Sequence, residues 1–290
     1  MSATTVAAIV VTYNRLELLK KTIEALRAQT RKPDAIFVIN NSSTDGTTDW
    51  LAEQKDITAI YQANTGSSGG QFAGFKAAYE AGYEWIWTMD DDVAPRENCL
   101  ETLLSTNLEP AIIRAPWRKS ASNEYYFNDT LQFNLTNPFK SLWVKIISQR
   151  ELKHEVVPAE GITFEGPLIH RSIVSRIGFP EKKFFIYGDD SEYFIRAKKA
   201  GATCVVMREA KMRRMLNPAD DLPITPKHFY IIRNLIAIDA LHGSILVRIL
   251  RPFLYMGVWL TRARNLKQAK IVIKAFACGY FFRRSKDLMP

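Results

Sequence analysis

An apolar segment that ends abruptly in three carboxylates runs Trp85-Ile86-Trp87-Thr88-Met89-Asp90-Asp91-Asp92-Val93-Ala94-Pro95. Its first five residues have the composition of a strand buried on both faces. Three adjacent acids repel one another unless a positive group lies beside them, and a divalent cation with oxygen ligands meets that need. This interpretation predicts a metal and phosphate site. The alternative is a polar turn before a helix, because Asp is common at N-caps and Pro95 could open a helix.

Upstream of this segment, strands alternate with helices over short connections. Strand patterns occupy 6–12, 36–39 and 57–61, and helical patterns follow at 16–26, 48–54 and 71–81. This alternation predicts an α/β fold with a parallel, doubly wound sheet, in which ligands bind outside the carboxyl ends of the strands. We therefore expect all four strand ends to line one crevice. These ends are Thr12 to Arg15, Asn40-Asn41, Asn64 to Gly70 and Asp90 to Asp92.

The third strand end is rich in glycine. Gly66, Gly69 and Gly70 precede a helical pattern, and their backbone amides could cradle a phosphate. The alternative is a flexible Gly/Ser connection. The spacing matches neither the dinucleotide fingerprint nor a Walker-type phosphate loop, so neither a nicotinamide dehydrogenase nor a P-loop enzyme is indicated.

The net charge of +9 is unevenly distributed. Residues 245–290 contain ten Lys or Arg and one acid, Asp287, so this tail carries +9 and the other 244 residues are neutral, with 29 bases and 29 acids. That distribution argues against nucleic-acid binding. The three cysteines, Cys99, Cys204 and Cys278, lie far apart without zinc or disulfide spacing. Because the amino terminus lacks a signal-peptide pattern, we expect a cytoplasmic protein.

A second acidic motif, Tyr187-Gly188-Asp189-Asp190-Ser191-Glu192, follows a strand pattern over 161–169 and a helical pattern over 171–177. Asp189 and Glu192 have capping-box spacing, and Gly201 is placed to close the helix. A cap does not require Asp190. The intervening stretch 116–153 is rich in aromatic residues and Asn, and we interpret it mainly as an irregular insert packed on the core, with an acceptor loop as the alternative.

Four motifs follow one another along the first 95 residues. They are Val10-Val11-Thr12-Tyr13-Asn14-Arg15, Asn40-Asn41-Ser42-Ser43-Thr44-Asp45-Gly46-Thr47, Asn64-Thr65-Gly66-Ser67-Ser68-Gly69-Gly70 and Met89-Asp90-Asp91-Asp92-Val93-Ala94-Pro95. In this order they resemble the inverting family 2 glycosyltransferases of GT-A fold, and the resemblance covers about residues 5–235. The likeness is greatest to bacterial galactofuranosyl- and rhamnosyltransferases that build cell-surface polysaccharides, O-antigen among them. It implies a Rossmann-like, mixed, mainly parallel sheet flanked by helices, here with a basic helical extension.

The resemblance implies a role for each motif. Asp90 and Asp91 would face the nucleotide ribose and the metal, and Asp92 with Asp90 would hold Mn²⁺ or Mg²⁺ against the diphosphate of a UDP- or dTDP-sugar. Many relatives have Asp-Asn where this chain has Asn40-Asn41, but an Asn carbonyl can still accept from the base. The implied nucleotide contacts are Thr12, Tyr13, Arg15, Asn40, Asn64, Gly69, Gly70, Asp90 and Asp91.

The family's general base is the second acid of the later pair. By resemblance Asp190 would deprotonate the acceptor hydroxyl, and Asp189 would cap the helix and contact the acceptor. Relatives commonly supply a further His ligand after the base, but Lys211 to Asn217 contains none. Asn217, water, or the charges of Arg213 and Arg214 are the substitutes to consider. The stretch Tyr230-Ile231-Ile232-Arg233-Asn234 resembles the family's helix near the diphosphate, on which His228 would be structural.

We expect two parts, a transferase domain over 1–235 and a tail over 236–290. Arg248, Arg251 and Pro252 interrupt the apolar run 245–260, so it is too short to span a membrane. We expect residues 245–290 to contact an anionic membrane surface, with 262–284 as a basic amphipathic helix or, alternatively, as a helix packed on the core. The expected acceptor is a glycan, possibly polyprenyl-linked, at the cytoplasmic face of the inner membrane. The alternatives are a nucleotidyltransferase and a non-catalytic protein that binds polyanions at membranes.

Overall fold

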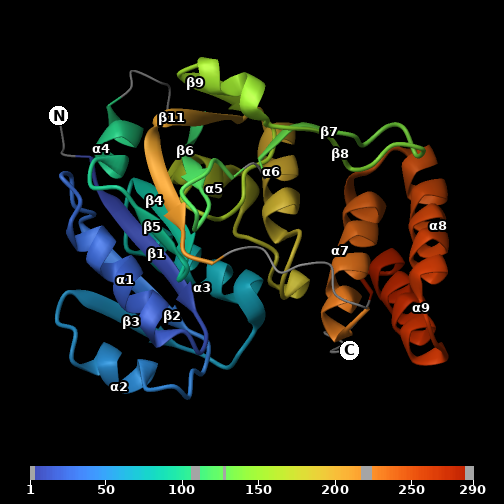
Figure 1. Cartoon of the computed structure of the whole chain (residues 1–290), viewed down its shortest axis with the longest axis horizontal. Coiled ribbons are helices and arrows are strands. Elements are labelled where there is room, and N and C mark those ends of the chain that lie inside the picture. The colour runs from blue at the N-terminus through green and yellow to red at the C-terminus, as the bar shows by residue number, and fades with distance from the viewer. Residues whose placement is uncertain (1–3, 106–111, 127–128, 217–223, 285–290) are drawn as a thin grey trace.

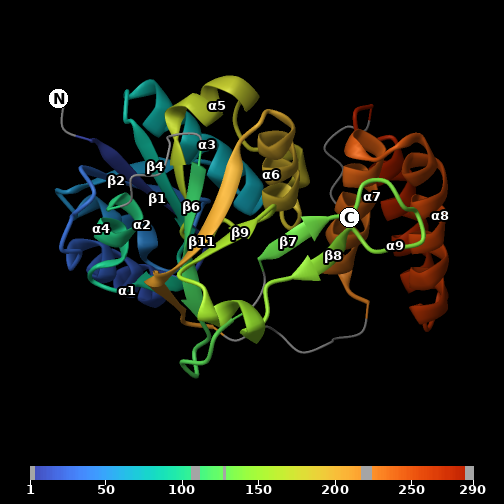
Figure 2. The ribbon, with the colours of Figure 1, turned by 90° about the horizontal axis from the view of Figure 1, so that it is seen from above.

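A mixed nine-stranded sheet forms the centre of the molecule, and helices cover both of its faces (Figures 1 and 2). The computed structural model describes residues 4–105, 112–126, 129–216 and 224–284. The order of the strands along the sheet is β3-β2-β1-β4-β10-β6-β11-β5, and β9 pairs with β11. The strands of this sheet are β1 (Val6–Thr12), β2 (Ala35–Asn40), β3 (Ile57–Tyr61), β4 (Trp85–Asp90), β5 (Val93–Pro95), β6 (Ile112–Lys119), β9 (Val156–Ala159), β10 (Leu168–His170) and β11 (Thr203–Arg214).

The amino-terminal half of the sheet is parallel, as the alternation of strands and helices predicts. β1 pairs with β2 and β4, and β2 pairs with β3, all in parallel register. Val11 lies opposite Asp90 and Thr12 opposite Asn40, which brings the carboxyl ends of three strands to one edge. The predicted meeting of strand ends at one edge of the sheet is therefore confirmed for β1, β2 and β4.

The other half of the sheet contains antiparallel pairs. β10 is antiparallel to both β4 and β6, and β11 is parallel to β6 but antiparallel to β5 and β9. The strand expected over 161–169 is wrong in extent, because only Leu168–His170 joins the sheet. Gly166 has a φ of +98° and Pro167 has no amide to donate, which interrupts the regular ladder before Leu168, although the Gly166 amide and the Pro167 carbonyl still hydrogen-bond to Thr88 of β4.

The helices divide between the two sheet faces. α1, α2 and α4 pack on the face that carries Val6, Ala8 and Val10, and α3, α5 and α6 pack on the opposite face. Successive β1 side chains alternate between these two cores, and all of them are buried. The helices are α1 (Leu16–Arg27), α2 (Thr47–Ala52), α3 (Gly66–Glu80), α4 (Cys99–Leu104), α5 (Arg171–Ile177) and α6 (Asp189–Lys199), with 3₁₀ turns η1 (Gln149–Lys153) and η2 (Lys182–Phe184).

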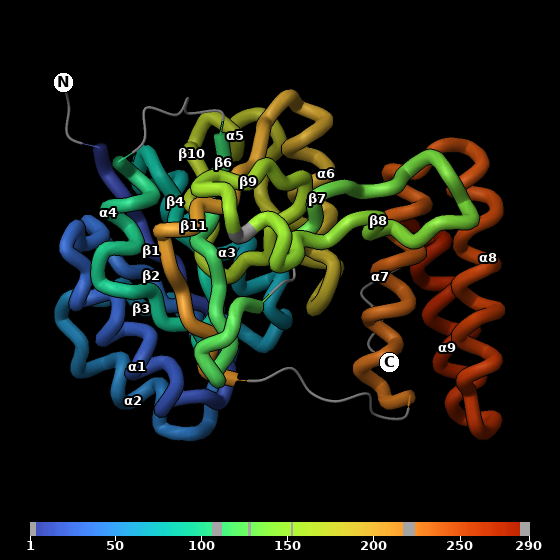
Figure 3. The backbone as a smooth tube through the Cα atoms, turned by 45° about the horizontal axis from the view of Figure 1, so that its top comes forward, coloured from blue at the N-terminus to red at the C-terminus, as the bar shows by residue number. Residues whose placement is uncertain are grey.

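Three further helices, α7 (Pro226–His242), α8 (Ile245–Arg262) and α9 (Leu266–Tyr280), stand beside the sheet domain. They share a separate apolar core. A hairpin of β7 (Thr130–Phe133) and β8 (Trp143–Ile146) reaches across to α8 (Figure 3). The division expected between residues 235 and 236 falls inside α7. Asn234 of α7 contacts the loop between η2 and α6, and Asp239 of α7 contacts α8.

Two segments that sequence patterns left open are ordered. α3 begins at Gly66, five residues before the expected start at Gln71, so the glycine segment is the first turn of a helix rather than a flexible connection. Within the insert 116–153, Trp117 and Phe133 are buried in the core, as the packing interpretation predicts. Phe139, by contrast, exposes 79% of its surface at the tip of the β7–β8 hairpin.

Candidate active site

The three acids after β4 meet the end of β1. The Thr12 hydroxyl donates to Asp91 Oδ2 at 2.7 Å, and the Arg15 guanidinium lies 3.2 Å from Asp91 Oδ1 and 3.3 Å from Asp92 Oδ2. Arg15 remains 45% exposed at its side chain, whereas Asp91 and Asp92 are buried. Thr12 and Arg15, both predicted nucleotide contacts, therefore lie in direct contact with the acidic motif.

The backbone of the acidic turn is held from two sides. The Thr22 hydroxyl of α1 lies 2.8 Å from the Asp91 carbonyl and 2.9 Å from the Val93 carbonyl. Met215, just after β11, donates its amide to the Asp92 carbonyl at 2.7 Å. These contacts place the turn between α1 and β11, so the carboxylates project from a rigid support.

The second acidic pair opens α6. Gly188 is the N-cap residue, with a φ of +80°, and Asp189 and Asp190 are the first two helical residues. The predicted capping box is wrong, because Asp189 makes no capping hydrogen bond and Glu192 instead binds Arg196 and His242. α6 ends at Lys199 and Gly201 has a φ of +82°, so the predicted glycine stop is confirmed.

Asn234 and Arg233 of α7 hold the loop that precedes Asp189. The Asn234 amide nitrogen donates to the carbonyls of Phe184, Ile186 and Tyr187 at 2.9, 2.8 and 2.6 Å. Arg233 donates to the carbonyls of Lys183 and Phe184, both at 2.7 Å. Phe185 and Tyr187 have φ values of +62° and +67°, a strained conformation for residues with side chains. The two α7 side chains thus compensate for strain beside the second acidic pair.

The glycine segment packs against this same loop. Gly66 has a φ of +73°, and a Cβ there would lie 2.0 Å from the Phe185 carbonyl oxygen. The Ser68 amide donates to that oxygen at 3.0 Å, and the Gly66 amide donates to Asn64 Oδ1 at 2.9 Å. These amides already have partners within the protein. To bind a phosphate, as predicted for this segment, these amides would have to give up the hydrogen bonds that they make within the protein.

Gly69 and Gly70 are buried where α3 approaches its neighbours. A Cβ on Gly69 would lie 2.1 Å from Thr65 Oγ1, and one on Gly70 would lie 2.3 Å from Val11 Cγ1. Gly70 permits the close packing of α3 on β1, whereas Gly69 makes room for Thr65, the N-cap residue of α3 itself. Both glycines are buried, so neither presents an exposed surface for the nucleotide contact that the resemblance implies.

The remaining predicted nucleotide contacts differ in exposure. Asn40 is buried. Its side-chain Oδ1 accepts from the Ser43 amide at 2.9 Å, and its Nδ2 donates to the Thr48 hydroxyl. Tyr13, beyond β1, exposes 46% of its surface and is free to stack on a planar ligand. Asn41, which was not predicted, donates to the Gly66 carbonyl and so joins the ends of β2 and α3.

Sequence reasoning missed the buried residue Glu165, between β9 and β10. Arg118 lies 2.6 Å from Glu165 Oε2 and 2.7 Å from Asp129, and Arg214 lies 3.2 Å from Glu165 Oε1. The positive charge of Arg214 also opposes the rise in the pKa of Asp92, whereas Arg213 is exposed to solvent. The signal was an isolated acid in the apolar stretch Thr163-Phe164-Glu165-Gly166. Asn217, considered as a substitute ligand, lies outside the described residues.

Burial dominates the electrostatics of these acids. It raises the pKa of Asp91 to about 6, against the Thr12 hydrogen bond and the Arg15 charge, and raises the pKa of Asp190 to about 6. Burial and the charge of Asp190 raise the pKa of Asp189 to about 7. The pKa of Asp90 is also raised well above its ordinary value by burial and by repulsion from Asp92 and Glu165. The described residues thus do not supply enough positive charge to keep the pKa values of these four carboxyl groups in their ordinary range.

The donor set suits a hard divalent cation, because it consists of carboxylate oxygens that repel one another. Asp92 and Asp90 are the residues that would hold it. The described residues contain no preformed group of three or more His, Cys, Asp or Glu side chains in ligating positions. A cation at this site would therefore take part of its coordination from substrate oxygens or water.

Comparison with known proteins identifies the family. Residues 7–177, more than half of the chain, match the family model described as glycosyl transferase family 2. The chain belongs to glycosyl transferase family 2. It is 28% identical over 219 residues to galactofuranosyltransferase GlfT1 of Mycolicibacterium smegmatis, covering 69% of this chain and 68% of that protein. It is also 33% identical over 104 residues to undecaprenyl-phosphate mannosyltransferase of Micrococcus luteus, covering 34% of this chain and 42% of that protein.

Solved structures place this family 2 member in the GT-A fold. A crystal structure of GalNAc-T7 with UDP, GalNAc and Mn²⁺ superposes with a TM-score of 0.69 at 11% identity. The match covers 96% of this chain, which spans 56% of the GalNAc-T7 chain. The predicted GT-A architecture, including the helical extension after the sheet domain, is confirmed. In the described part of the chain, no helix combines the length and apolar content needed to cross a bilayer.

Proposed function

We propose that this glycosyltransferase inverts the anomeric carbon of a UDP- or dTDP-sugar while moving a hexosyl group to a glycan acceptor. The observation that carries the proposal is the acidic pair at the start of α6, buried Asp189 and half-buried Asp190, together with the proximity of Asp189 to Asp90, whose pKa its charge helps to raise. An in-line displacement needs acidic groups with two functions in one site. One accepts the proton of the nucleophile, and the others hold the cation that neutralises the charge of the leaving group.

Asp190 serves as the general base. Its carboxylate accepts the proton of the acceptor hydroxyl while that oxygen bonds to the anomeric carbon and the bond from this carbon to the diphosphate oxygen breaks. A raised pKa near 6 makes it a stronger base than an ordinary Asp while leaving it ionised at neutral pH. Asp189, whose Oδ2 is buried without a hydrogen-bond partner among the described residues, is placed to orient an acceptor hydroxyl.

Mn²⁺ or Mg²⁺ held by Asp92 and Asp90 would neutralise the departing diphosphate when bound. The crystal structure of GalNAc-T7 contains Mn²⁺, which supports a divalent cation in this fold. Arg15 and Arg214 already lie against Asp92 and its neighbour Glu165. We propose that these arginines share the diphosphate charge, so that the cation enhances transfer rather than being its only source of positive charge.

The donor is expected to carry galactofuranose, with rhamnose as the second choice. Support comes from the likeness to GlfT1 over two thirds of the chain. The acceptor is expected to be a polyprenyl-linked glycan of surface polysaccharide synthesis, and the likeness to an undecaprenyl-phosphate mannosyltransferase supports a lipid-linked substrate. The protein would then work at the cytoplasmic face of the inner membrane. Family membership favours this function over a nucleotidyltransferase or a non-catalytic polyanion binder.

Nucleotide binding and transfer, measured separately on two variants, test the proposal. UDP, dTDP and GDP are titrated with and without Mn²⁺, and transfer is then followed with the matching donor sugars. Asp190→Asn should retain nucleotide affinity but lose about 10²–10⁴ in kcat. Asp92→Asn should lose the Mn²⁺-dependent part of nucleotide binding. Asp49→Asn, on the exposed side of α2, is the matched control. Full activity of Asp190→Asn, or binding of no nucleotide, would reject the proposal.

A further inference from the structure

One side of α8 is a largely exposed apolar surface, on which the Phe253 ring also contacts Phe276 and Tyr280 of α9. Ile245 and Leu246 expose 76% and 59% of their surface. The exposed positions recur every three to four residues, so they form one continuous row along the helix. We define the α8 row as Ile245, Leu246, Ile249, Leu250, Phe253, Leu254 and Val258.

The rotation of α8 that exposes this row is fixed from the opposite side. Arg251 is 1% exposed, and its Nε donates to Asp239 of α7 at 2.8 Å. A second Arg251 nitrogen donates to the carbonyls of Asn134 and Lys140 in the β7–β8 hairpin at 2.8 and 3.1 Å. Turning the row inward would expose this buried ion pair, so its exposure is a built feature of the fold.

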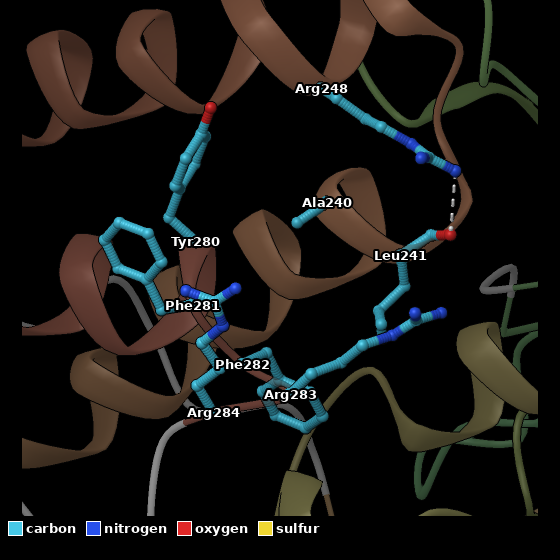
Figure 4. A pocket seen from close by; sticks show the side chains of 8 residues that line it. All are labelled: Ala240, Leu241, Arg248, Tyr280, Phe281, Phe282, Arg283 and Arg284. Atoms are coloured by element: carbon cyan, nitrogen blue, oxygen red, sulfur yellow. Dashed lines mark hydrogen bonds between the residues drawn. The ribbon is translucent and has the colours of Figure 1, made fainter.

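Exposed cations lie near both ends of the row, and residues 245–284 contain no Asp or Glu. Arg262, Arg264, Lys267 and Lys270 are exposed where α8 turns into α9. At the other end, Arg248, Arg283 and Arg284 line a cavity of about 180 Å³ between α7 and the end of α9 (Figure 4). In that view Arg248 donates to the Leu241 carbonyl, at 3.2 Å. The surface thus combines an apolar centre with a positive border.

We propose that the α8 row lies on the surface of an anionic lipid membrane, with the bordering cations against the headgroup phosphates. Aliphatic and aromatic side chains bordered by Lys and Arg are the composition of helices that lie in the headgroup layer. A second copy of this chain fits less well, because it would oppose one cluster of cations to another. The inference deepens the lipid-linked acceptor of the proposed function, on which it rests.

This assignment narrows the membrane-facing segment expected over residues 245–290. Within 262–284, α9 buries Val272, Ala275 and Cys278 against α7, as the alternative of a helix packed on the core predicts. The exposed apolar surface lies on α8, whose uncharged stretch is too short to span a bilayer. Because α7 contacts α8 through Asp239 and holds the loop before Asp190 through Asn234, membrane docking would also orient the active site.

Vesicle flotation of the full chain tests the proposal. The vesicles are phosphatidylcholine alone or with about one third phosphatidylglycerol. The native chain should bind the anionic vesicles and be released by high salt. Leu250→Glu and Phe253→Glu should each weaken binding about tenfold or more, since each removes buried apolar area and adds a negative charge. Tyr61→Glu, 52% exposed on β3, is the matched control and should bind as the native chain does.

Lys267→Glu and Lys270→Glu should weaken binding to anionic vesicles and leave thermal unfolding unchanged, which separates the charge contribution from folding. Failure of the native chain to bind anionic vesicles, or equal binding by Phe253→Glu, would overturn the assignment. So would a dimer in sedimentation equilibrium that Phe253→Glu dissociates, because the row would then be an interface between copies. UDP binding by all variants, measured in parallel, tests the active-site proposal independently.

Discussion

The side-chain amide of Asn234, in the middle of α7, donates a 2.6 Å hydrogen bond to the carbonyl of Tyr187, three residues before Asp190. Tyr187 has a φ of +67°, and the same amide also reaches the carbonyls of Phe184 and Ile186. Asn234 therefore ties the helical extension to the loop that aims the proposed base. It is a positioning residue, since it acts through the backbone of that loop.

Replacing Asn234 by Leu should slow catalysis as well as destabilise the fold. The change removes the donor shared by three carbonyls, and leaving buried polar groups unpaired costs about 1–3 kcal/mol each. We expect the free energy of unfolding to fall by at least about 2 kcal/mol and kcat to fall about tenfold or more, because the base is displaced. UDP affinity should change little. Asn265→Ala, which removes the N-cap of α9, should cost about 1 kcal/mol without changing kcat. A normal kcat in folded Asn234→Leu would exclude the positioning role.

Gly66→Ala should be more damaging than Gly82→Ala. Both glycines have positive φ, +73° and +87°, so each change carries backbone strain of about 1–2 kcal/mol. Only at Gly66 does the new Cβ meet another atom, the Phe185 carbonyl oxygen at 2.0 Å, whereas nothing lies within 4 Å at Gly82. Thermal unfolding and kcat of the two variants check this, and Gly66→Ala should lose activity by shifting the loop. Equal behaviour of the two variants would show that this contact is unimportant.

The pH dependence of transfer should report the raised pKa of the proposed base. Burial raises the pKa of Asp190 to about 6 and that of Asp189 to about 7. Because the base must be ionised, kcat/KM should fall as the pH drops through about 7 to 6 and should be level above that range. An unperturbed Asp would keep its activity down to about pH 4. A flat profile between about pH 5 and 8 would therefore contradict burial of the base.

The metal-free protein should become less stable as the pH rises across the same range. The folded pKa values of Asp91, Asp189 and Asp190 lie above the ordinary value of 3.8, so the folded state binds more protons than the unfolded state in between. The resulting stability is full below about pH 4 and is lost as the pH rises through about 6 to 7. Mn²⁺ would bind Asp90 and Asp92 in their ionised form, and their pKa values are raised too, so it should raise the melting temperature more at about pH 7.5 than at about pH 5. An equal Mn²⁺ effect at both pH values would argue against Asp90 and Asp92 as ligands.

The ion pair between Arg251 and Asp239 should be essential to the helical extension. Arg251→Met leaves Asp239 buried without its partner, which should lower the free energy of unfolding by about 3–5 kcal/mol. Adding Asp239→Leu should recover much of that loss, because no charge is then buried alone. Arg27→Met, which breaks the exposed pair with Asp56, is the control and should cost less than about 1 kcal/mol. Denaturant unfolding measures the stability of all three variants. Equal losses of stability in Arg251→Met and Arg27→Met would show that the buried ion pair does not anchor α8 to α7.

The sequence by itself determined the parallel half of the sheet and the motifs at its edge. Strand periodicity and the short connections identify β1 to β4, and their polar ends supply Thr12, Arg15 and the acids Asp90 to Asp92 at one place. Local chemistry was sufficient there because each buried strand is continuous in the chain and parallel register brings equivalent ends together.

Only the tertiary structure decided the partners of those residues. That Glu165 joins Arg118 and Arg214, that Asn234 restrains a strained loop, and that Gly66 admits the Phe185 carbonyl all depend on contacts between distant segments. The orientation of α8 was likewise hidden, because Arg251 looks like one more surface cation until Asp239 and two hairpin carbonyls surround it. Composition reports how much charge and apolar surface a helix has. Which side of the helix is covered depends on long-range packing, which no local pattern records.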